Sequence, residues 1–289
     1  MFSDFTTPLP VQPGEILVLG IVGGWERWDA PHRAIRRAAL ELRSMRLPGT
    51  WVETVENHKL DLARELVKQA FDFDKSGRLD PAESAAAQII VYGQSLGGSA
   101  TLRLCRWLNE QGIRVRLAVV IDSHGRDPYS VPANVAVAAN LYQRDFGAVK
   151  GAPKIVAEDP RQTRILGNWR YRYKGQDVAM PGEPFLRRWF MGSHLKMEYD
   201  PEPWRRVRDL LVSAVNNSGP DAICSLPGWV VKTRPDPRKA GDLVLLSSEV
   251  NGAIRDLRPG GIEITARRLF LHCWGQGGAW NNLRKPPMS

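Results

Sequence analysis

Cysteine is scarce in this 289-residue chain: Cys105, Cys224 and Cys273 are its only three, and none belongs to a CxxC pair. This count and spacing favour neither a disulfide framework nor a zinc site, and they are typical of a reducing compartment. No run of 18 apolar residues occurs, and the first fifteen residues contain neither a basic nor an apolar segment of the kind that begins a secretion signal. We therefore expect a cytoplasmic chain without a transmembrane segment.

Dense basic runs are also missing, although the formal net charge is +9. The arginines are scattered singly or in pairs such as Arg36-Arg37 and Arg187-Arg188, and no zinc-finger, RNP or basic-zipper signature occurs. We interpret the scattered basic residues as parts of solvent-exposed helix faces and expect no nucleic-acid partner. If a nucleic acid did bind, its affinity would depend strongly on the salt concentration.

Apolar runs alternate with helical periodicity over the first two thirds of the chain. The runs predict strands at 15–22, 50–57, 87–93, 115–121 and 134–143, and the periodic segments predict helices at 31–45, 59–71, 97–112 and 201–215. Strands and helices in this alternation form parallel sheets through right-handed crossovers. The sequence predicts an α/β fold with a doubly wound, mostly parallel sheet.

The composition changes near residue 217. "NNSGP" (216–220) is followed by a segment rich in Pro, Gly and Arg, in which only short runs such as "DLVLLSS" and "RRLFLHCW" are able to form strands. We expect a main domain over 1–217 and a C-terminal appendage of uncertain order over 218–289.

The most informative stretch is "IIVYGQSLGGSATLRL", Ile89 to Leu104. Gly93-Gln94-Ser95-Leu96-Gly97 fits G-x-S-x-G between a predicted strand and a predicted helix, the context in which this motif presents a serine nucleophile. The glycines allow the strand and the helix to approach closely, and the N–H of Leu96 is free to bind an oxyanion. A phosphate-binding turn is the alternative, but neither G-x-G-x-x-G nor a lysine follows.

The chain resembles the α/β-hydrolase superfamily, a lipase- and esterase-like group of serine hydrolases, over about residues 12–215. The resemblance implies a nucleophile, an acid and a histidine in that chain order. It places the general base at His194, which lies in "GSHLKMEYDPEPW" directly before the helix at 201–215. The other histidines are weaker candidates: His32 and His58 precede the serine, His124 lies near the acid loop, and His272 lies in the appendage.

The acid is left open among three aspartates. Asp122 directly follows the strand at 115–121, at the carboxyl end where sites gather in open α/β sheets. Asp145 follows the next strand, which is the commoner position in the superfamily, and Asp127 lies between them. Asp122 is the preferred candidate.

A second oxyanion donor is expected in the loop after the first strand, "IVGGWERW", at about Gly24. The histidine that often precedes the glycines in the superfamily is missing, but a backbone donor needs no particular side chain. Substrate-binding loops are expected at 123–134 and 160–193. The second holds an aromatic set that favours an apolar acyl or aryl group: Trp169, Tyr171, Tyr173, Phe185, Trp189 and Phe190.

"DFDKSGRLDPAE", residues 72–83, matches a twelve-residue EF-hand calcium loop. Gly77 allows the sharp turn, and the spacing predicts a structural Ca²⁺ ion held by Asp72, Asp74, Ser76, the Arg78 carbonyl, Asp80 and Glu83. The alternative is a polar helix connection in which Asp80 and Glu83 form only a capping box. No cofactor is expected for catalysis.

Together these features predict a serine hydrolase that cleaves a carboxylic ester or thioester through an acyl-enzyme, with a small-molecule ester or acyl substrate. The alternative is a non-catalytic, calcium-stabilised binding protein of the same fold, because a fold does not ensure activity.

Overall fold

The computed structural model describes residues 1–125, 128–216, 233–235, 243–245, 249–250 and 253–254. The chain divides into two compact units, Met1–Pro220 and Asp221–Ser289. In the second unit, β9 (Thr233–Pro235) pairs with β10 (Leu243–Leu245), and β11 (Glu249–Val250) pairs with β12 (Ala253–Ile254), both antiparallel. The "RRLFLHCW" run lies outside the described residues. The first unit carries the candidate site.

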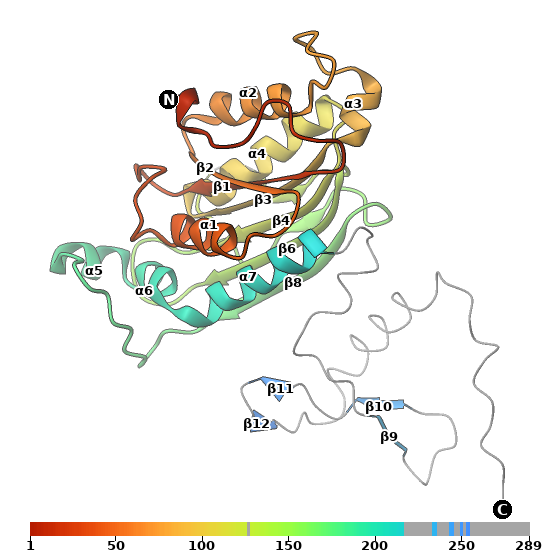
Figure 1. Ribbon diagram of the computed structural model, residues 1–289. Helices are drawn as coiled ribbons and strands as arrows, with labels where there is room; N and C mark the ends of the chain where they lie inside the picture. Colours follow the sequence, from red (N-terminus) through yellow and green to blue (C-terminus); the bar gives the residue numbers. More distant parts are fainter. Residues whose placement is uncertain (126–127, 217–232, 236–242, 246–248, 251–252, 255–289) are drawn as a thin grey trace, which may run out of the picture. The chain divides into compact units, whose positions relative to one another are not determined.

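The first unit is built on a six-stranded sheet in the order β2-β1-β3-β4-β6-β8 (Figure 1). All neighbouring strands are parallel. The strands are β1 (Ile16–Val22), β2 (Thr50–Glu56), β3 (Gln88–Gln94), β4 (Val115–Ile121), β6 (Val135–Gln143) and β8 (Arg164–Tyr171). The predicted α/β fold with a doubly wound parallel sheet is confirmed.

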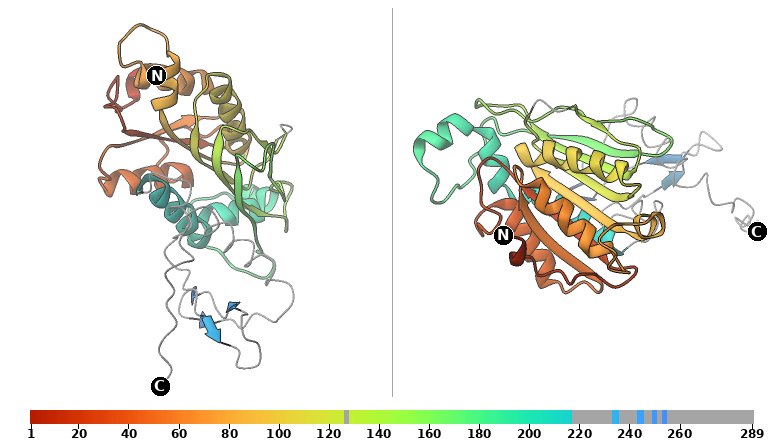
Figure 2. Two further views of the ribbon diagram at one scale, coloured as in Figure 1. Left: turned by 90° about the vertical axis from the view of Figure 1, so that its right-hand side faces the viewer. Right: turned by 90° about the horizontal axis from the view of Figure 1, so that it is seen from above.

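Helices cover both faces of the sheet (Figures 1 and 2). Helices α1 (Ala34–Ser44) and α7 (Pro201–Asn216) lie on one face, and α2 (Leu60–Phe71) and α4 (Leu96–Glu110) lie on the other. The chain moves from β1 to β2 in one direction across the sheet and from β3 to β8 in the other, so right-handed crossovers place their helices on opposite faces. The carboxyl ends of β1 and β3 therefore flank the point where the strand order reverses, which is where open α/β sheets bind ligands.

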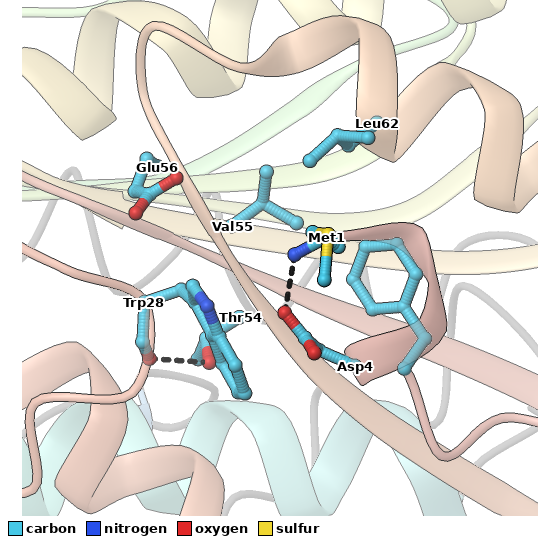
Figure 3. A pocket seen from close by; sticks show the side chains of 8 residues that line it. Met1, Asp4, Trp28, Thr54, Val55, Glu56 and Leu62 are labelled. Atoms are coloured by element: carbon cyan, nitrogen blue, oxygen red, sulfur yellow. Dashed lines mark hydrogen bonds and ion pairs between the residues drawn. The ribbon is translucent and has the colours of Figure 1, made fainter.

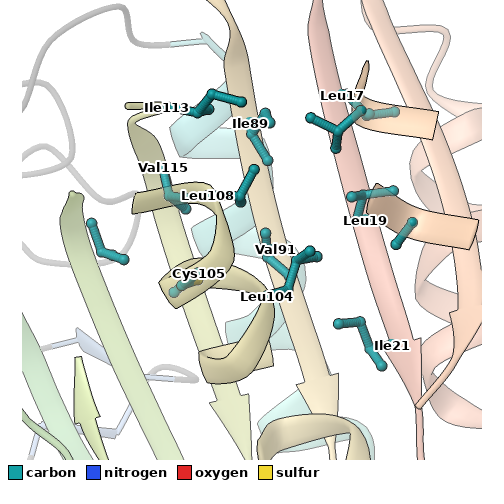
Figure 4. Packing of buried hydrophobic residues seen from close by; sticks show 14 of the residues in the cluster. Leu17, Leu19, Ile21, Ile89, Val91, Leu104, Cys105, Leu108, Ile113 and Val115 are labelled. Atoms are coloured by element: carbon teal, nitrogen blue, oxygen red, sulfur yellow. The ribbon is translucent and has the colours of Figure 1, made fainter. Parts of the chain in front are cut away.

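The core explains why the strands are continuous apolar runs. Leu17, Leu19 and Ile21 of β1 pack with Ile89 and Val91 of β3, and all five are fully buried (Figure 4). Helix α4 covers them with Leu104 and Leu108. Strands buried on both faces need apolar side chains at every position, unlike half-exposed strands.

Strand β8 was not predicted, and it falls within the segment expected to be a substrate-binding loop. It is the edge strand of the sheet, and most of its residues are only half-buried. Its sequence, "RILGNWRY", therefore lacks the apolar run that identifies the central strands. The short helices α5 (Phe185–Met191) and α6 (Ser193–Tyr199) follow it.

The remaining elements of the first unit are η1 (Phe2–Asp4), α3 (Pro81–Ala86), β5 (Ser130–Val131) and β7 (Val156–Ala157). Within the part of the chain that the structure describes, no helix has the length and apolar character needed to cross a bilayer.

Candidate active site

Ser95 lies in a sharp turn between β3 and α4. Its φ of 58° is in the left-handed region, which is strained for a residue with a side chain. The turn is possible only because glycines flank it: a Cβ at Gly93 would lie 2.3 Å from the Gly97 carbonyl oxygen, and one at Gly97 would lie 2.1 Å from the Ile21 oxygen. Strain that the surrounding backbone imposes on a half-buried serine is typical of a functional position.

Asp122 and His194 are joined by a short hydrogen bond. Asp122 directly follows β4, its carboxylate is fully buried, and its φ of 42° is also left-handed. Its Oδ2 lies 2.6 Å from Nδ1 of His194, which is 3% exposed. Because an ionised carboxylate only accepts hydrogen bonds, Nδ1 carries the proton when the imidazole is neutral, and Nε2 is then the acceptor.

The backbone brings the segment that carries Asp122 beside the serine. The Ser95 N–H donates to the Ile121 carbonyl at 2.9 Å, and the Ser95 carbonyl accepts from the His124 N–H at 3.2 Å, so the loop that carries Asp122 is bound to the turn on both sides. Within residues 1–125 and 128–216, no hydrogen bond joins the Ser95 hydroxyl to His194. Catalytic hydrogen bonds of this kind often tighten only in the complex with substrate.

Electrostatics favour a charged imidazole at position 194. Burial acts to lower the pKa of His194, but the hydrogen bond and charge of Asp122, together with the charges of Glu198 and Glu26, raise that pKa above its ordinary value. The site is therefore suited to stabilising an imidazolium, the form that a general base takes after it accepts a proton.

The rival residues are placed elsewhere. Asp145 accepts hydrogen bonds from Arg170 and from the Tyr173 N–H, and among the described residues no hydrogen bond or ion pair joins it to His194. Asp127 and His272 lie outside the described residues. The other histidines, His32, His58 and His124, are exposed.

Two segments offer backbone donors near Ser95. Leu96 is the first residue of α4, so its N–H has no partner within the helix. The loop after β1 reaches the same place, because a Cβ at Gly23 would lie 3.0 Å from the Ser95 Cβ. Gly24 has a φ of 49°, and its carbonyl accepts a hydrogen bond from the Asn57 side chain, which fixes the peptide next to it.

A buried ionic cluster, which the sequence did not reveal, holds α6 in place. Arg33, which follows the β1 loop, lies 3.4 Å from Glu26, 3.0 Å from Glu183 and 3.2 Å from Glu198 of α6. Arg187 of α5 adds ion pairs with Glu26 and Glu183. Burial and the charge of Glu198 raise the pKa of Glu26 to about 7, against the opposing effect of the two arginines and His194.

The predicted aromatic set is divided among β8, α5 and the segment between them, where the buried Tyr173 donates to Asp200 at 2.8 Å. Trp169 and Tyr171 belong to β8. The guanidinium of Arg206, a residue of α7, lies 4.7 Å from the centre of the Trp169 ring. Phe185 and Trp189 lie on α5 and are 71% and 60% exposed. Helix α5 also exposes Leu186 and Phe190.

The predicted calcium loop brings three of its six candidate ligands together. Ligand atoms of Asp72, Asp74 and Glu83 lie within 4.8 Å of one another. Asp72 also accepts hydrogen bonds from the N–H groups of Ser76 and Gly77, at 2.9 and 2.8 Å. Ser76 donates to the Arg78 carbonyl. Asp80 and Glu83 form a capping box at the start of α3, which is the alternative interpretation of these residues.

A small pocket at the carboxyl end of β2 contains none of these residues (Figure 3). Its polar groups are satisfied locally: the Met1 amino group pairs with Asp4, and Thr54 donates to the Trp28 carbonyl at 2.8 Å. We assign it no role in the site.

Comparison with known proteins shows no family for this chain. No family model matches the sequence, and no curated protein matches it. Among solved structures, the chain is similar to "a novel cutinase-like protein from Cryptococcus sp.", with a TM-score of 0.37 and 13% sequence identity over 71% of this chain and 97% of that one.

Proposed function

We propose that this chain is a serine hydrolase of the α/β-hydrolase superfamily that cleaves a carboxylic ester or thioester. The observation that carries the proposal is the 2.6 Å hydrogen bond between His194 and the buried Asp122. The backbone on both sides of Asp122 is hydrogen-bonded to Ser95, which lies in a strained strand-to-helix turn. A buried carboxylate that orients the Nδ1–H of a histidine is the geometry by which serine hydrolases activate their nucleophile.

In the proposed reaction the Ser95 hydroxyl oxygen attacks the substrate carbonyl while Nε2 of His194 accepts its proton. Asp122 holds the imidazole and stabilises its positive charge. The N–H groups of Leu96 and the Gly24 region receive the oxyanion. His194 then gives the proton to the departing alcohol or thiol, and an acyl-enzyme remains. Water, deprotonated by His194, releases the acid and restores Ser95.

The exposed apolar side chains of α5 favour a substrate with an apolar acyl or aryl group. This helix immediately precedes α6, which carries His194, so its Phe185, Leu186, Trp189 and Phe190 lie next to the proposed base in the chain. Apolar side chains that bury part of a substrate contribute about 25 cal/mol per Å² of apolar surface removed from water.

A panel of nitrophenyl and thiol esters of increasing acyl length tests this function. We expect kcat/KM to rise from acetyl to medium-chain acyl groups, and Ser95→Ala to abolish turnover. Ser99→Ala is the matched control, because Ser99 lies one turn along α4 and its hydroxyl is occupied by Ser123 and the His124 carbonyl. Hydrolysis that survives in Ser95→Ala would contradict the proposal.

The alternative function is a non-catalytic binding protein of the same fold. The feature that favours it is the absence of a hydrogen bond between Ser95 and His194 among the described residues. If the panel is not hydrolysed by a well-folded protein, this alternative is preferred.

We also propose that residues 72–83 bind a structural Ca²⁺ ion. The sequence spacing and the proximity of Asp72, Asp74 and Glu83 support this assignment. The ion would stabilise the connection between α2 and β3, the strand that leads into Ser95, and would take no part in catalysis.

Thermal unfolding with added Ca²⁺ or with a chelator tests the metal assignment. At a Ca²⁺ concentration of about 100 times Kd, binding stabilises the folded state by about 2.7 kcal/mol, so Tm rises. Asp72→Asn should lose this response, and Asp61→Asn, on the exposed side of α2, should keep it. An unchanged Tm in the wild type would remove the calcium assignment and leave the capping box as the only role of these residues.

A further inference from the structure

Gln143, the last residue of β6, has a buried side chain that contacts Asp122. Its Nε2 donates to Asp122 Oδ2 at 2.9 Å, and its backbone N–H donates to Asp122 Oδ1 at 2.9 Å. Oδ2 therefore receives hydrogen bonds from both Gln143 and His194. One residue thus contacts both oxygens of the carboxylate that holds the proposed base.

The orientation of the Gln143 amide is fixed by groups that cannot exchange roles. Its Oε1 accepts from the Asp145 N–H at 3.0 Å, and its Nε2 also donates to the Val149 carbonyl at 2.9 Å. A backbone N–H only donates and a carbonyl only accepts, so a flipped amide would lose both bonds. The Nε2–H is consequently held toward Asp122.

The other side of the carboxylate is closed by Gly151. A Cβ at this position would lie 2.0 Å from Asp122 Oδ1, and the Gly151 N–H donates to the Gln143 carbonyl at 3.1 Å. Asp122 is fully buried, so its negative charge is distributed among the protein donors that surround it. In a low-dielectric environment each such hydrogen bond affects the charge more strongly than it would in water.

We propose that Gln143 is a positioning residue that fixes the Asp122 carboxylate and limits how strongly it attracts the His194 proton. This inference rests on the proposed serine hydrolase function. Without the Nε2–H, Asp122 Oδ2 has only the His194 Nδ1–H as a side-chain donor, and its charge acts more fully on the imidazole. The carboxylate also loses one of the contacts that hold it in place.

The test is the pH dependence of inactivation by a fluorophosphonate, which needs no knowledge of the natural substrate. Gln143→Met removes the amide and keeps the length of the side chain. We expect the inactivation rate constant on the high-pH plateau to fall about tenfold to a hundredfold, the range for losing a hydrogen bond to a charged group. We also expect the fall in rate at low pH to begin at a higher pH than in the wild type. Asn134→Leu is the matched control, because Asn134 directly precedes β6, at the end opposite Gln143, and its buried side-chain amide donates to the Cys105 and Ile113 carbonyls.

The inference would be overturned if folded Gln143→Met kept the acid limb at the wild-type pH and its plateau rate constant stayed within about twofold of the wild-type value. The proposed function would remain intact. Should that variant fail to fold, the side-chain amide protons of Gln143 in ¹⁵N-labelled wild type provide the test. We expect their NMR signals to shift with the titration of His194, and signals that do not move would also overturn it. This measurement does not depend on activity, so it separates failure of the inference from failure of the proposed function.

Discussion

At the scale of single residues, two backbone positions carry the strain of the site. Ser95 and Asp122 both adopt left-handed φ angles, and each directly follows a central parallel strand. Non-glycine residues in this region cost about 1 to 3 kcal/mol each and persist only where the surrounding structure holds them. The strain places both side chains at the carboxyl end of the sheet, one on the nucleophile turn and one against His194.

Asp122→Asn should lower the fluorophosphonate reaction rate by about 10⁴-fold, because an amide NH₂ facing Nδ1 favours the wrong tautomer of His194. Asp145→Asn is the comparison, since Asp145 bonds Arg170 and the Tyr173 N–H instead. We expect less than a threefold effect from the second change. Equal losses in the two variants, measured as second-order rate constants at pH 8, would show that Asp122 is not the acid.

At the scale of elements, α6 is held against the rest of the site by ion pairs as well as by its contacts with β6. Arg33 joins the segment after β1 to Glu198 of α6 and to Glu183, residues 165 and 150 positions away in the chain. Removing one member of a buried ionic cluster leaves the other charges uncompensated, which costs more than the loss of an exposed pair. The position of His194 therefore depends on a residue near the other end of the domain's sequence.

Arg33→Met should lower the free energy of unfolding by about 3 to 5 kcal/mol at pH 8, because Glu26, Glu183 and Glu198 lose their shared cation. The deficit should shrink as the pH falls below about 7, where Glu26 takes up a proton. Arg27→Met is the control, since the Arg27–Asp29 pair is exposed, and its Tm should match that of the wild type. Chemical denaturation at two pH values measures both, and a small, pH-independent loss in Arg33→Met would contradict the role of the cluster.

The elements also show what a sequence reveals and what it does not. Strands β1, β2, β3, β4 and β6 and the turn at Ser95 were predictable because their signals are local: apolar runs, and glycines at fixed positions around a serine. Strand β8 was missed because this edge strand is mostly half-buried and lacks an apolar run. His194, expected directly before the helix at 201–215, lies in the seven-residue α6. Asp122, Asp145 and Asp127 could not be separated, because the choice depends on which one faces a histidine some 70 positions further along the chain. Gln143 and Arg33 are informative only through such distant contacts, although the place of Gln143 at a strand's carboxyl end was a usable signal.

At the scale of the whole molecule, the charges around the site determine its response to pH. His194 faces Asp122 directly, and Glu26 and Glu198 lie close enough to raise its pKa. Arg33 and Arg187 neutralise part of that negative charge. Because Glu26 itself titrates at about 7, two groups change charge in the same pH range.

The rate of acylation should therefore fall as the pH is lowered, since only neutral His194 accepts a proton. The raised pKa of His194 places the midpoint of this loss above pH 6.5, and the titration of Glu26 broadens it. Glu26→Gln removes one negative charge near the imidazole, so the midpoint should move to lower pH and the transition should become steeper. Rate constants between pH 5 and 9 measure the effect, and a midpoint that stays in place would show that Glu26 does not act on His194.

The most direct test of the central claim is covalent labelling of the full chain with a fluorophosphonate, read by intact mass and by peptide mapping. The account predicts a single adduct on the peptide that contains Ser95, and no adduct in Ser95→Ala. A folded wild type that takes up no label with Ca²⁺ present, or that carries its label on another serine, would contradict the assignment of Ser95 as the nucleophile.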